Sequence, residues 1–136
     1  MLYGKNVVLG VSGGIAVYKA CEIVSRLKKL GANVDVVMTD NAREFVTPLT
    51  FQTLAKSAVV TNAFEPVKEF DINHISLAKK ADILVVAPAT ANVIAKFAKG
   101  IADDMLSTTY LACNAQKLIC QAMNCNMYED AATQEN

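Results

Sequence analysis

The sequence predicts an α/β domain built on a doubly wound parallel sheet with helices on both faces. Two short apolar runs, Lys5–Val11 and Asn33–Thr39, flank a glycine turn and a segment with helical spacing of its apolar residues. A strand, a helix and a second strand in this order form the opening unit of a parallel α/β sheet. A third apolar run, Ile83–Ala87, suits a strand that is buried on both faces. The length of 136 residues predicts a single domain over residues 1–136.

The first half of the chain also gives clear signals for where its helices end. Residues 15–30 carry apolar side chains at helical spacing, and Gly31 follows as a typical C-terminal cap. Residues 41–56 predict two short helices separated just before Pro48, because proline disfavours a helical conformation in the residue ahead of it. Residues 59–70 predict a less regular connection.

In the second half, the third strand is expected to stop at Pro88, and a helix is expected over residues 93–99. At least one carboxylate of Asp103–Asp104 is expected to cap the helix that follows. Residues 117–120 predict a last strand, and residues 121–136 predict a loop rich in Asn and Met.

The charge pattern argues against a nucleic acid or an anionic membrane as partner. Thirteen basic and thirteen acidic residues cancel, and no run of like charge occurs. Hydrophobic residues make up 53% of the chain and charged residues only 19%. We therefore expect part of the apolar surface to lie in contacts between subunits of a homo-oligomer.

The same sequence indicates a cytoplasmic protein without a metal site. The N-terminus lacks the layout of a signal peptide, and no apolar run is long enough to cross a bilayer. The four cysteines form no CxxC pair, and a single histidine leaves no other common zinc ligand set. Free thiols fit a reducing compartment.

Two turns are expected at the same edge of the sheet. Ser12–Gly14 follow the first strand, and the turn Thr39–Asn41 comes after the second. Amide and hydroxyl groups at such an edge suit a phosphate, whereas the alternative is that the glycines only allow a tight turn. No acidic residue ends the second strand to hold a ribose, which favours a mononucleotide over a dinucleotide.

The third strand leads into a second candidate region. Ala89 and Ala91 are small enough for a flat ligand to approach the backbone, and Thr90 and Asn92 offer hydroxyl and amide hydrogen bonds. His74 precedes this strand, and its imidazole suits proton transfer at neutral pH. A lone histidine is also often structural, so the residues by themselves leave both roles open.

Several of these segments together resemble the flavin-containing cysteine decarboxylases, and the resemblance covers nearly the whole chain. Within that family the motifs are most similar to the bacterial phosphopantothenoylcysteine decarboxylases of coenzyme A biosynthesis. The segments that carry the resemblance are His74–Leu77, Ala81–Asp82, Ala87–Asn92, Gly100–Thr109, Ala122–Asn124 and Met127–Tyr128.

The resemblance implies a flavodoxin-like, Rossmann-type fold that binds FMN at the subunit interface of a homo-trimer, often assembled into a dodecamer. It implies that His74 is the catalytic base, and that Asn124 is catalytic and binds the substrate carboxylate beside Met123. The cofactor-binding residues that it implies are Ser12, Gly13, Thr39, Phe45, Thr90, Ala91, Asn92 and Val93.

The reaction that the resemblance implies is the FMN-dependent conversion of 4′-phosphopantothenoylcysteine to 4′-phosphopantetheine. A carboxylate beta to a thiol leaves poorly, because the carbanion that forms has no electron sink. Oxidation of the cysteine end to a thioaldehyde creates that sink, and CO₂ is then lost. The flavin carries the redox step, while the protein orients the groups and handles protons.

Two departures from the family pattern affect these expectations. Gln121 stands where the family commonly has a proline before Ala-Met-Asn, which leaves that loop less rigid. The family's C-terminal substrate clamp, with its proton-donating cysteine, has no counterpart within residues 1–136, which suggests a fragment or a truncated paralogue. We therefore expect this carboxy-lyase to bind FMN but to be impaired, stalling at the oxidised enethiol.

Two other functions stay open at this point, and two more are disfavoured. A peptidyl-cysteine decarboxylase would use the same flavin site, and a non-catalytic flavin-binding or regulatory subunit would suit a truncated chain. An electron-transfer flavodoxin is disfavoured because such proteins usually carry an acidic surface, and this chain is neutral. A related flavin prenyltransferase is disfavoured because His74 and Asn124 match the decarboxylases.

Overall fold

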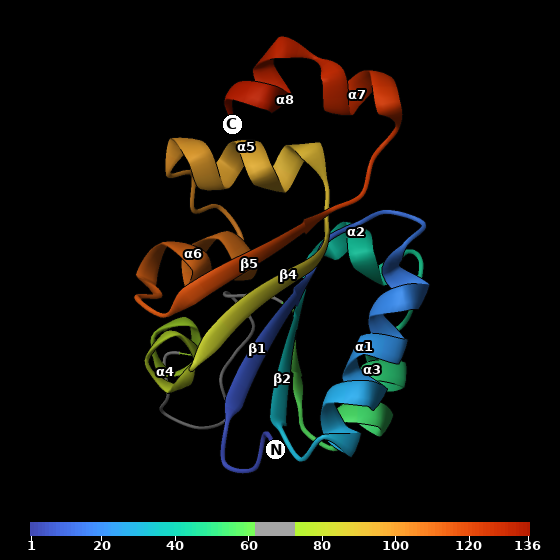
Figure 1. Cartoon of the computed structure of the whole chain (residues 1–136), viewed down its shortest axis with the longest axis vertical. Coiled ribbons are helices and arrows are strands. Elements are labelled where there is room, and N and C mark those ends of the chain that lie inside the picture. The colour runs from blue at the N-terminus through green and yellow to red at the C-terminus, as the bar shows by residue number, and fades with distance from the viewer. Residues whose placement is uncertain (62–72) are drawn as a thin grey trace.

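The computed structural model describes residues 1–61 and 73–136, without the side chains of Asn73 and His74. Its core is a five-stranded, all-parallel sheet in the order β3-β2-β1-β4-β5. Helices α1 and α3 cover one face, and α4 and α6 cover the other (Figure 1). The predicted class, a doubly wound Rossmann-type α/β sheet, is confirmed.

Strands and helices alternate along most of the described chain. The strands are β1 (Asn6–Val11), β2 (Asn33–Met38), β3 (Val59–Val60), β4 (Ile83–Ala89) and β5 (Gln116–Gln121). The first four helices are α1 (Val17–Lys29), α2 (Asp40–Arg43), α3 (Pro48–Ala55) and α4 (Asn73–Lys80). The remaining helices are α5 (Ala91–Lys99), α6 (Met105–Ala112), α7 (Cys125–Glu129) and α8 (Ala131–Glu135).

Each side of the sheet carries its own hydrophobic core, which explains why the β1 sequence is apolar at nearly every position. Leu9 and Val11 pack with α1 and α3, in a cluster that includes the fully buried Phe51. Val8 points to the opposite face and packs with Leu84 and the helices there. Because successive side chains of a strand point to opposite faces, a strand covered on both sides needs apolar residues throughout.

Local signals fix most helix ends as predicted. Gly31 follows α1 with φ +93°, a conformation that favours glycine, and Pro48 is the first residue of α3. Asp104 caps α6 through a capping box with Ser107, so one of the two aspartates has the predicted role. Asp103 instead pairs with a lysine of α5.

Three sequence-based predictions of local structure were wrong. Strand β4 continues through Pro88 to Ala89, where a register shift against β5 replaces regular pairing. Residues 59–60 form a short strand at the sheet edge rather than an irregular connection. Residues 125–135 form α7 and α8, because Asn124 and Asp130 each cap a helical turn that the Asn-rich composition concealed.

Helix α4 is tied to the sheet by a side-chain ion pair. Asp35 of β2 points to the face that α4 covers, and its Oδ2 lies 2.9 Å from Nζ of Lys80. The exposed fraction of the Asp35 side chain is only 17%, so this carboxylate needs a charged partner. The pair anchors the last turn of α4 to β2.

The strand order places a ligand crevice at one end of the sheet. The chain moves outward from β1 through β2 to β3 and then returns to β4 on the other side of β1. Ligands of such sheets bind beyond the carboxyl ends of the strands, at the point where the order reverses. That point lies between β1 and β4, near the starts of α2 and α5 at the top of Figure 1.

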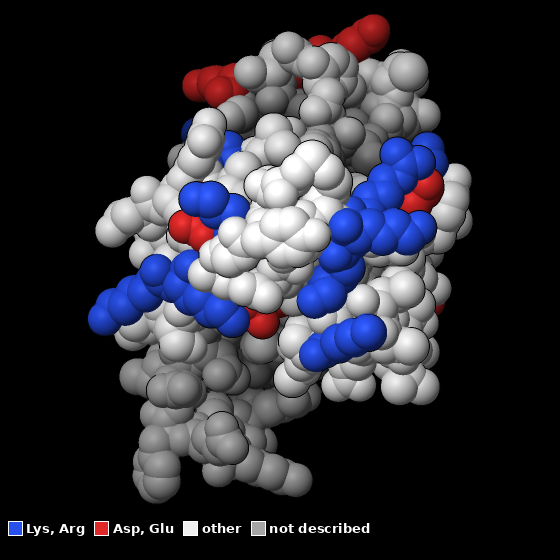
Figure 2. All heavy atoms as spheres, turned by 60° about the horizontal axis from the view of Figure 1, so that its bottom comes forward, with Lys and Arg blue, Asp and Glu red and all other residues white. Residues whose placement is uncertain are grey.

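The face of the molecule away from the crevice carries separate groups of basic side chains. Figure 2 brings the bottom of Figure 1 forward, and the Lys and Arg side chains on this face form two groups with uncharged residues between them. This face therefore carries no single continuous basic patch over the part of the chain that the structure describes.

We predict that Gly10→Ala destabilises the protein through one close contact. A methyl group there would collide with Cδ1 of Leu106 and lie 3.2 Å from its Cδ2, and Leu106 is only 1% exposed. Over-packing of this kind costs about 1–3 kcal/mol of unfolding free energy. Urea unfolding should show a smaller penalty in a Leu106→Val background, and equal penalties in both backgrounds would contradict the contact as the cause.

Candidate functional site

A buried serine joins the two strands at the reversal point. The hydroxyl of Ser12, 1% exposed, donates to the carbonyl of Pro88 at 2.6 Å and accepts from the backbone N–H of Thr90 at 3.0 Å. The backbone N–H of Ser12 also donates to Pro88 at 3.2 Å. The single hydroxyl therefore fixes the end of β1 against the end of β4.

Two threonines begin the helices that leave this edge. Thr39 Oγ1 accepts from the backbone N–H of Ala42 at 3.2 Å, and Thr90 Oγ1 accepts from that of Val93 at 3.4 Å. A hydroxyl that accepts as an N-cap keeps its own O–H for another acceptor. Both threonines can therefore donate to a ligand in the crevice.

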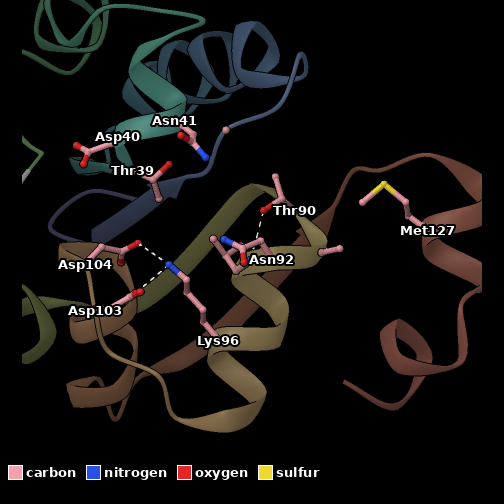
Figure 3. A pocket seen from close by; sticks show the side chains of 12 residues that line it. Thr39, Asp40, Asn41, Thr90, Asn92, Lys96, Asp103, Asp104 and Met127 are labelled. Carbon is pink, nitrogen blue, oxygen red and sulfur yellow. Dashed lines mark hydrogen bonds and ion pairs between the residues drawn. The ribbon is translucent and has the colours of Figure 1, made fainter.

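The crevice is a cavity of about 460 Å³, within the range of roughly 300–1,000 Å³ typical of small-molecule sites. Figure 3 shows its walls, with α2 on one side, α5 opposite and α7 at one end. The described residues that line it are Gly13, Thr39, Asp40, Asn41, Thr90, Ala91, Asn92, Val93, Lys96, Asp103, Asp104 and Met127.

The N-terminus of α5 gives this cavity backbone donors. The first residues of a helix have N–H groups without partners in the helix itself, and Ala91 and Asn92 occupy these positions. The positive end of the helix dipole lies at the same place. The wall is therefore suited to an anionic or strongly polar group.

Helix α5 also places a lysine in the wall, against two carboxylates. Nζ of Lys96 lies 2.8 Å from Oδ1 of Asp103 and 3.5 Å from Oδ2 of Asp104, as the dashed lines of Figure 3 mark. The hydrogen bond with Asp103 raises the pKa of Lys96 and lowers the pKa of Asp103. Lys96 and Asp103 are therefore both charged across the neutral range, and their ion pair is lost only in acid that protonates Asp103 or in strong base.

A second cavity of about 380 Å³ adjoins the first and is lined mainly by apolar groups. It shares Gly13, Thr90, Ala91 and Met127 with the first cavity. Its other walls come from the start of α1 and the start of α7, with the lining residues Gly14, Ile15, Ala16, Ala122, Met123 and Asn124.

Asn124 presents a defined hydrogen-bonding group to this second cavity. Its Oδ1 accepts from the backbone N–H of Asn126 at 2.8 Å, as the N-cap of α7. With the amide oxygen engaged, the amide nitrogen remains as a donor. The side chain can therefore bind a carboxylate or carbonyl oxygen.

The structure brings most of the predicted site residues to the two cavities. Gly13, Thr39 and Thr90–Val93 line the first, and Met123 and Asn124 line the second. Ser12 lies behind the wall, fully engaged with β4. Their roles in binding stay predictions.

One predicted residue lies elsewhere, and the location of another side chain is not described. Phe45 follows α2, is 50% exposed and does not line either of these cavities. The side chain of His74 lies outside the described residues; the helix that begins beside it packs against α6.

Sequence reasoning missed Lys96 as a lining residue and left open which of Asp103 and Asp104 caps the next helix. A usable signal was present for Lys96, since Asn92 and Lys96 are four residues apart and lie on the same side of a helix. Among the described residues, no group of three or more His, Cys, Asp or Glu could hold a metal ion. No helix in that part of the chain has the length and apolar character to cross a membrane.

Comparison with known sequences gives matches over the full chain. The profile of the Flavoprotein family matches residues 1–136. The coenzyme A biosynthesis bifunctional protein CoaBC of Bacillus subtilis is 54% identical over 136 residues, which cover 100% of this chain and 34% of that protein. CoaBC of Escherichia coli is 48% identical over 135 residues, 99% of this chain and 33% of that protein. The chain thus spans about a third of the length of the curated relatives it matches.

Solved structures agree with the fold. The FMN-dependent cysteine decarboxylase SpaF is 33% identical with a TM-score of 0.92, over 99% of this chain and 78% of that one. A PPC decarboxylase complexed with pantothenoylaminoethenethiol is 25% identical with a TM-score of 0.79, over 96% of this chain and 74% of that one.

We predict that alanine destabilises the protein much more at Gly13 than at Gly14, the two glycines of the first turn. A methyl group at Gly13 would collide with Cβ of Asn41 and lie 2.8 Å from its backbone carbonyl carbon, so α2 must shift. At Gly14 the nearest atom is Cγ2 of Thr90 at 3.8 Å, an ordinary contact. Gly13→Ala should cost about 1–3 kcal/mol of unfolding free energy and Gly14→Ala less than about 0.5 kcal/mol. Similar unfolding midpoints for both variants would contradict the tight packing of α2.

Proposed function

This chain belongs to the Flavoprotein family, and we propose that it binds FMN and decarboxylates 4′-phosphopantothenoylcysteine on the route to 4′-phosphopantetheine in coenzyme A biosynthesis. The observation that carries this proposal is the 54% identity with CoaBC of Bacillus subtilis across the entire chain. The likeness to a solved PPC decarboxylase supports it. The curated relatives are longer bifunctional proteins, and we assign the decarboxylase activity to the part of them that this chain matches.

The first cavity fits FMN in both chemistry and size. FMN carries a phosphate, hydroxyl groups on its ribityl chain and a flat ring system. The O–H groups of Thr39 and Thr90 and the free N–H groups at the start of α5 would donate to the phosphate and the hydroxyl groups. Val93 and the small side chain of Ala91 leave apolar wall against which a flat ring can pack.

Bound FMN would supply a two-electron oxidant that turns the thiol carbon of the substrate into an electron sink for the loss of CO₂. The protein's part is to bind, orient and exclude water. The second cavity shares a wall with the first, so a substrate there would lie next to the cofactor. We propose that the amide nitrogen of Asn124 holds the substrate carboxylate, with Met123 covering it.

We further propose His74 as the group that handles protons at the thiol. It is the only histidine of the chain, and its pKa range allows it to accept a proton near neutral pH. This role comes from the family resemblance, because the described residues do not include its side chain.

A cysteine at the end of a peptide is the second candidate substrate. The observation that favours it is the TM-score of 0.92 with SpaF, a structure described as a cysteine decarboxylase. Both substrates present the same cysteine end, so the flavin site would serve either one. They differ in what is attached to the cysteine nitrogen.

We also propose a homo-oligomer, a trimer or a dodecamer of four trimers, in the cytoplasm. Large apolar side chains beside the second cavity support subunit contacts, since Ile15 is 76% exposed and Tyr18 is 59% exposed. The four free cysteines suit a reducing compartment.

One experiment tests the cofactor and the substrate together. The purified chain is reconstituted with FMN and offered 4′-phosphopantothenoylcysteine or a cysteine-ended peptide, and CO₂ release and product mass are measured. We expect visible flavin absorbance at about one FMN per chain, and CO₂ release with the phosphopantothenoyl substrate. Lack of FMN binding would refute the cofactor, and CO₂ release from the peptide alone would favour the second candidate.

We predict that Asn124→Asp weakens substrate binding. The change replaces a donor with a carboxylate that repels the substrate carboxylate, so we expect KM to rise at least tenfold, with FMN affinity unchanged. Asn126→Asp is the matched control two residues away. Asn126 contacts Asn124 through its backbone N–H, which this substitution leaves in place. An unchanged KM in Asn124→Asp would exclude the proposed contact.

A further inference from the structure

The lysine in the wall of the first cavity stands opposite an excess of negative charge. The charged residues lining that cavity are Asp40, Asp103, Asp104 and Lys96. Three carboxylates against one ammonium group leave a formal charge of −2 at neutral pH, and the loss of Lys96 would make it −3. A ligand that carries a phosphate meets this charge when it enters.

The structure keeps the ammonium group of Lys96 fixed in that wall. Its side chain is only 19% exposed and is held by both Asp103 and Asp104, at 2.8 Å and 3.5 Å. The pairing raises the pKa of Lys96, so its positive charge persists well above neutral pH.

A purely mechanical role explains Lys96 less well. The loop after α5 is already held at its far end by the capping box of Asp104 and Ser107. Its near end is fixed by Gly100, which caps α5 and donates to the carbonyl of Lys96 through the backbone. With both ends of the loop held by other hydrogen bonds, the distinctive contribution of the lysine side chain is its charge.

We propose that Lys96 is a specificity-determining residue that compensates the carboxylates of the cavity and so strengthens the binding of a phosphate-bearing flavin. This rests on the proposed binding of FMN. The lysine need not touch the ligand, because the Debye length is about 10 Å at 0.1 M ionic strength and charges closer than this still interact appreciably. The lysine therefore favours FMN over its uncharged counterpart riboflavin.

The test compares the affinities of FMN and riboflavin, measured by flavin fluorescence at low ionic strength. Lys96→Met should weaken FMN about fourfold, the size expected when a dianionic phosphate loses one compensating charge about 10 Å away, and should change riboflavin less than about twofold. Lys96→Arg keeps the charge and should bind both flavins as the unaltered chain does. Lys99→Met is the matched control, an exposed lysine on the same helix that does not line the cavity.

A double variant separates charge from tethering. Lys96→Met with Asp103→Asn returns the lining to its original formal charge without restoring the ion pair. We expect FMN affinity to recover in the double variant, and 1 M salt to reduce the difference between Lys96→Met and the unaltered chain. Asp103→Asn alone should tighten FMN, which keeps the test independent of how well Lys96→Met folds.

Each outcome decides between the proposals. Equal losses of FMN and riboflavin in Lys96→Met, with no recovery in the double variant, would make Lys96 a structural tether and overturn the inference. Unchanged FMN affinity in Lys96→Met and in Asp103→Asn would also overturn it, while leaving the proposed function intact. Failure of the unaltered chain to bind FMN would refute the proposed function and the inference together.

Discussion

The hydroxyl of Ser12 is the contact on which the arrangement of both cavities depends. It joins the carbonyl of Pro88 to the backbone N–H of Thr90, and so holds the last residues of β1 and β4 together where the strand order reverses. The turn of Gly13 and the first turn of α5 both leave from this junction. A buried hydroxyl with both a donor and an acceptor partner has little freedom to reorient, so the walls on either side keep a fixed separation.

Much of the fold could be predicted because the sequence signals were local. Apolar runs marked β1, β2 and β4, Gly31 and Pro48 marked helix ends, and their order implied a parallel sheet. The errors came from signals that tertiary contacts override. The apolar run stops at Pro88, but β4 continues through it, because β4 lies between β1 and β5, which hold its backbone on both sides. Helices α7 and α8 were concealed because Asn and Asp that suggest a loop here cap short helices.

The candidate site was predictable in its location and less so in its chemistry. The ends of the first two predicted strands placed Gly13 and Thr39 at one edge of the sheet, and the cavity lies there. Ser12 looked like a ligand group, but its hydrogen bonds are internal, and that depends on the register between β1 and β4. The pairing of Lys96 with Asp103 was equally hidden, since it depends on how the loop after α5 folds back.

The shared wall of the two cavities has a thermodynamic consequence. Thr90, Ala91 and Met127 border both spaces, so an occupant of either cavity would contact residues that also line the other. Met127 is the adaptable member of this wall, because its unbranched thioether side chain can adopt many rotamers. Thermodynamic linkage requires reciprocity: if a ligand in one cavity changes the affinity of the other cavity by some factor, a ligand in that other cavity changes the affinity of the first by the same factor. Any coupling between ligands in the two cavities must therefore be equal in both directions.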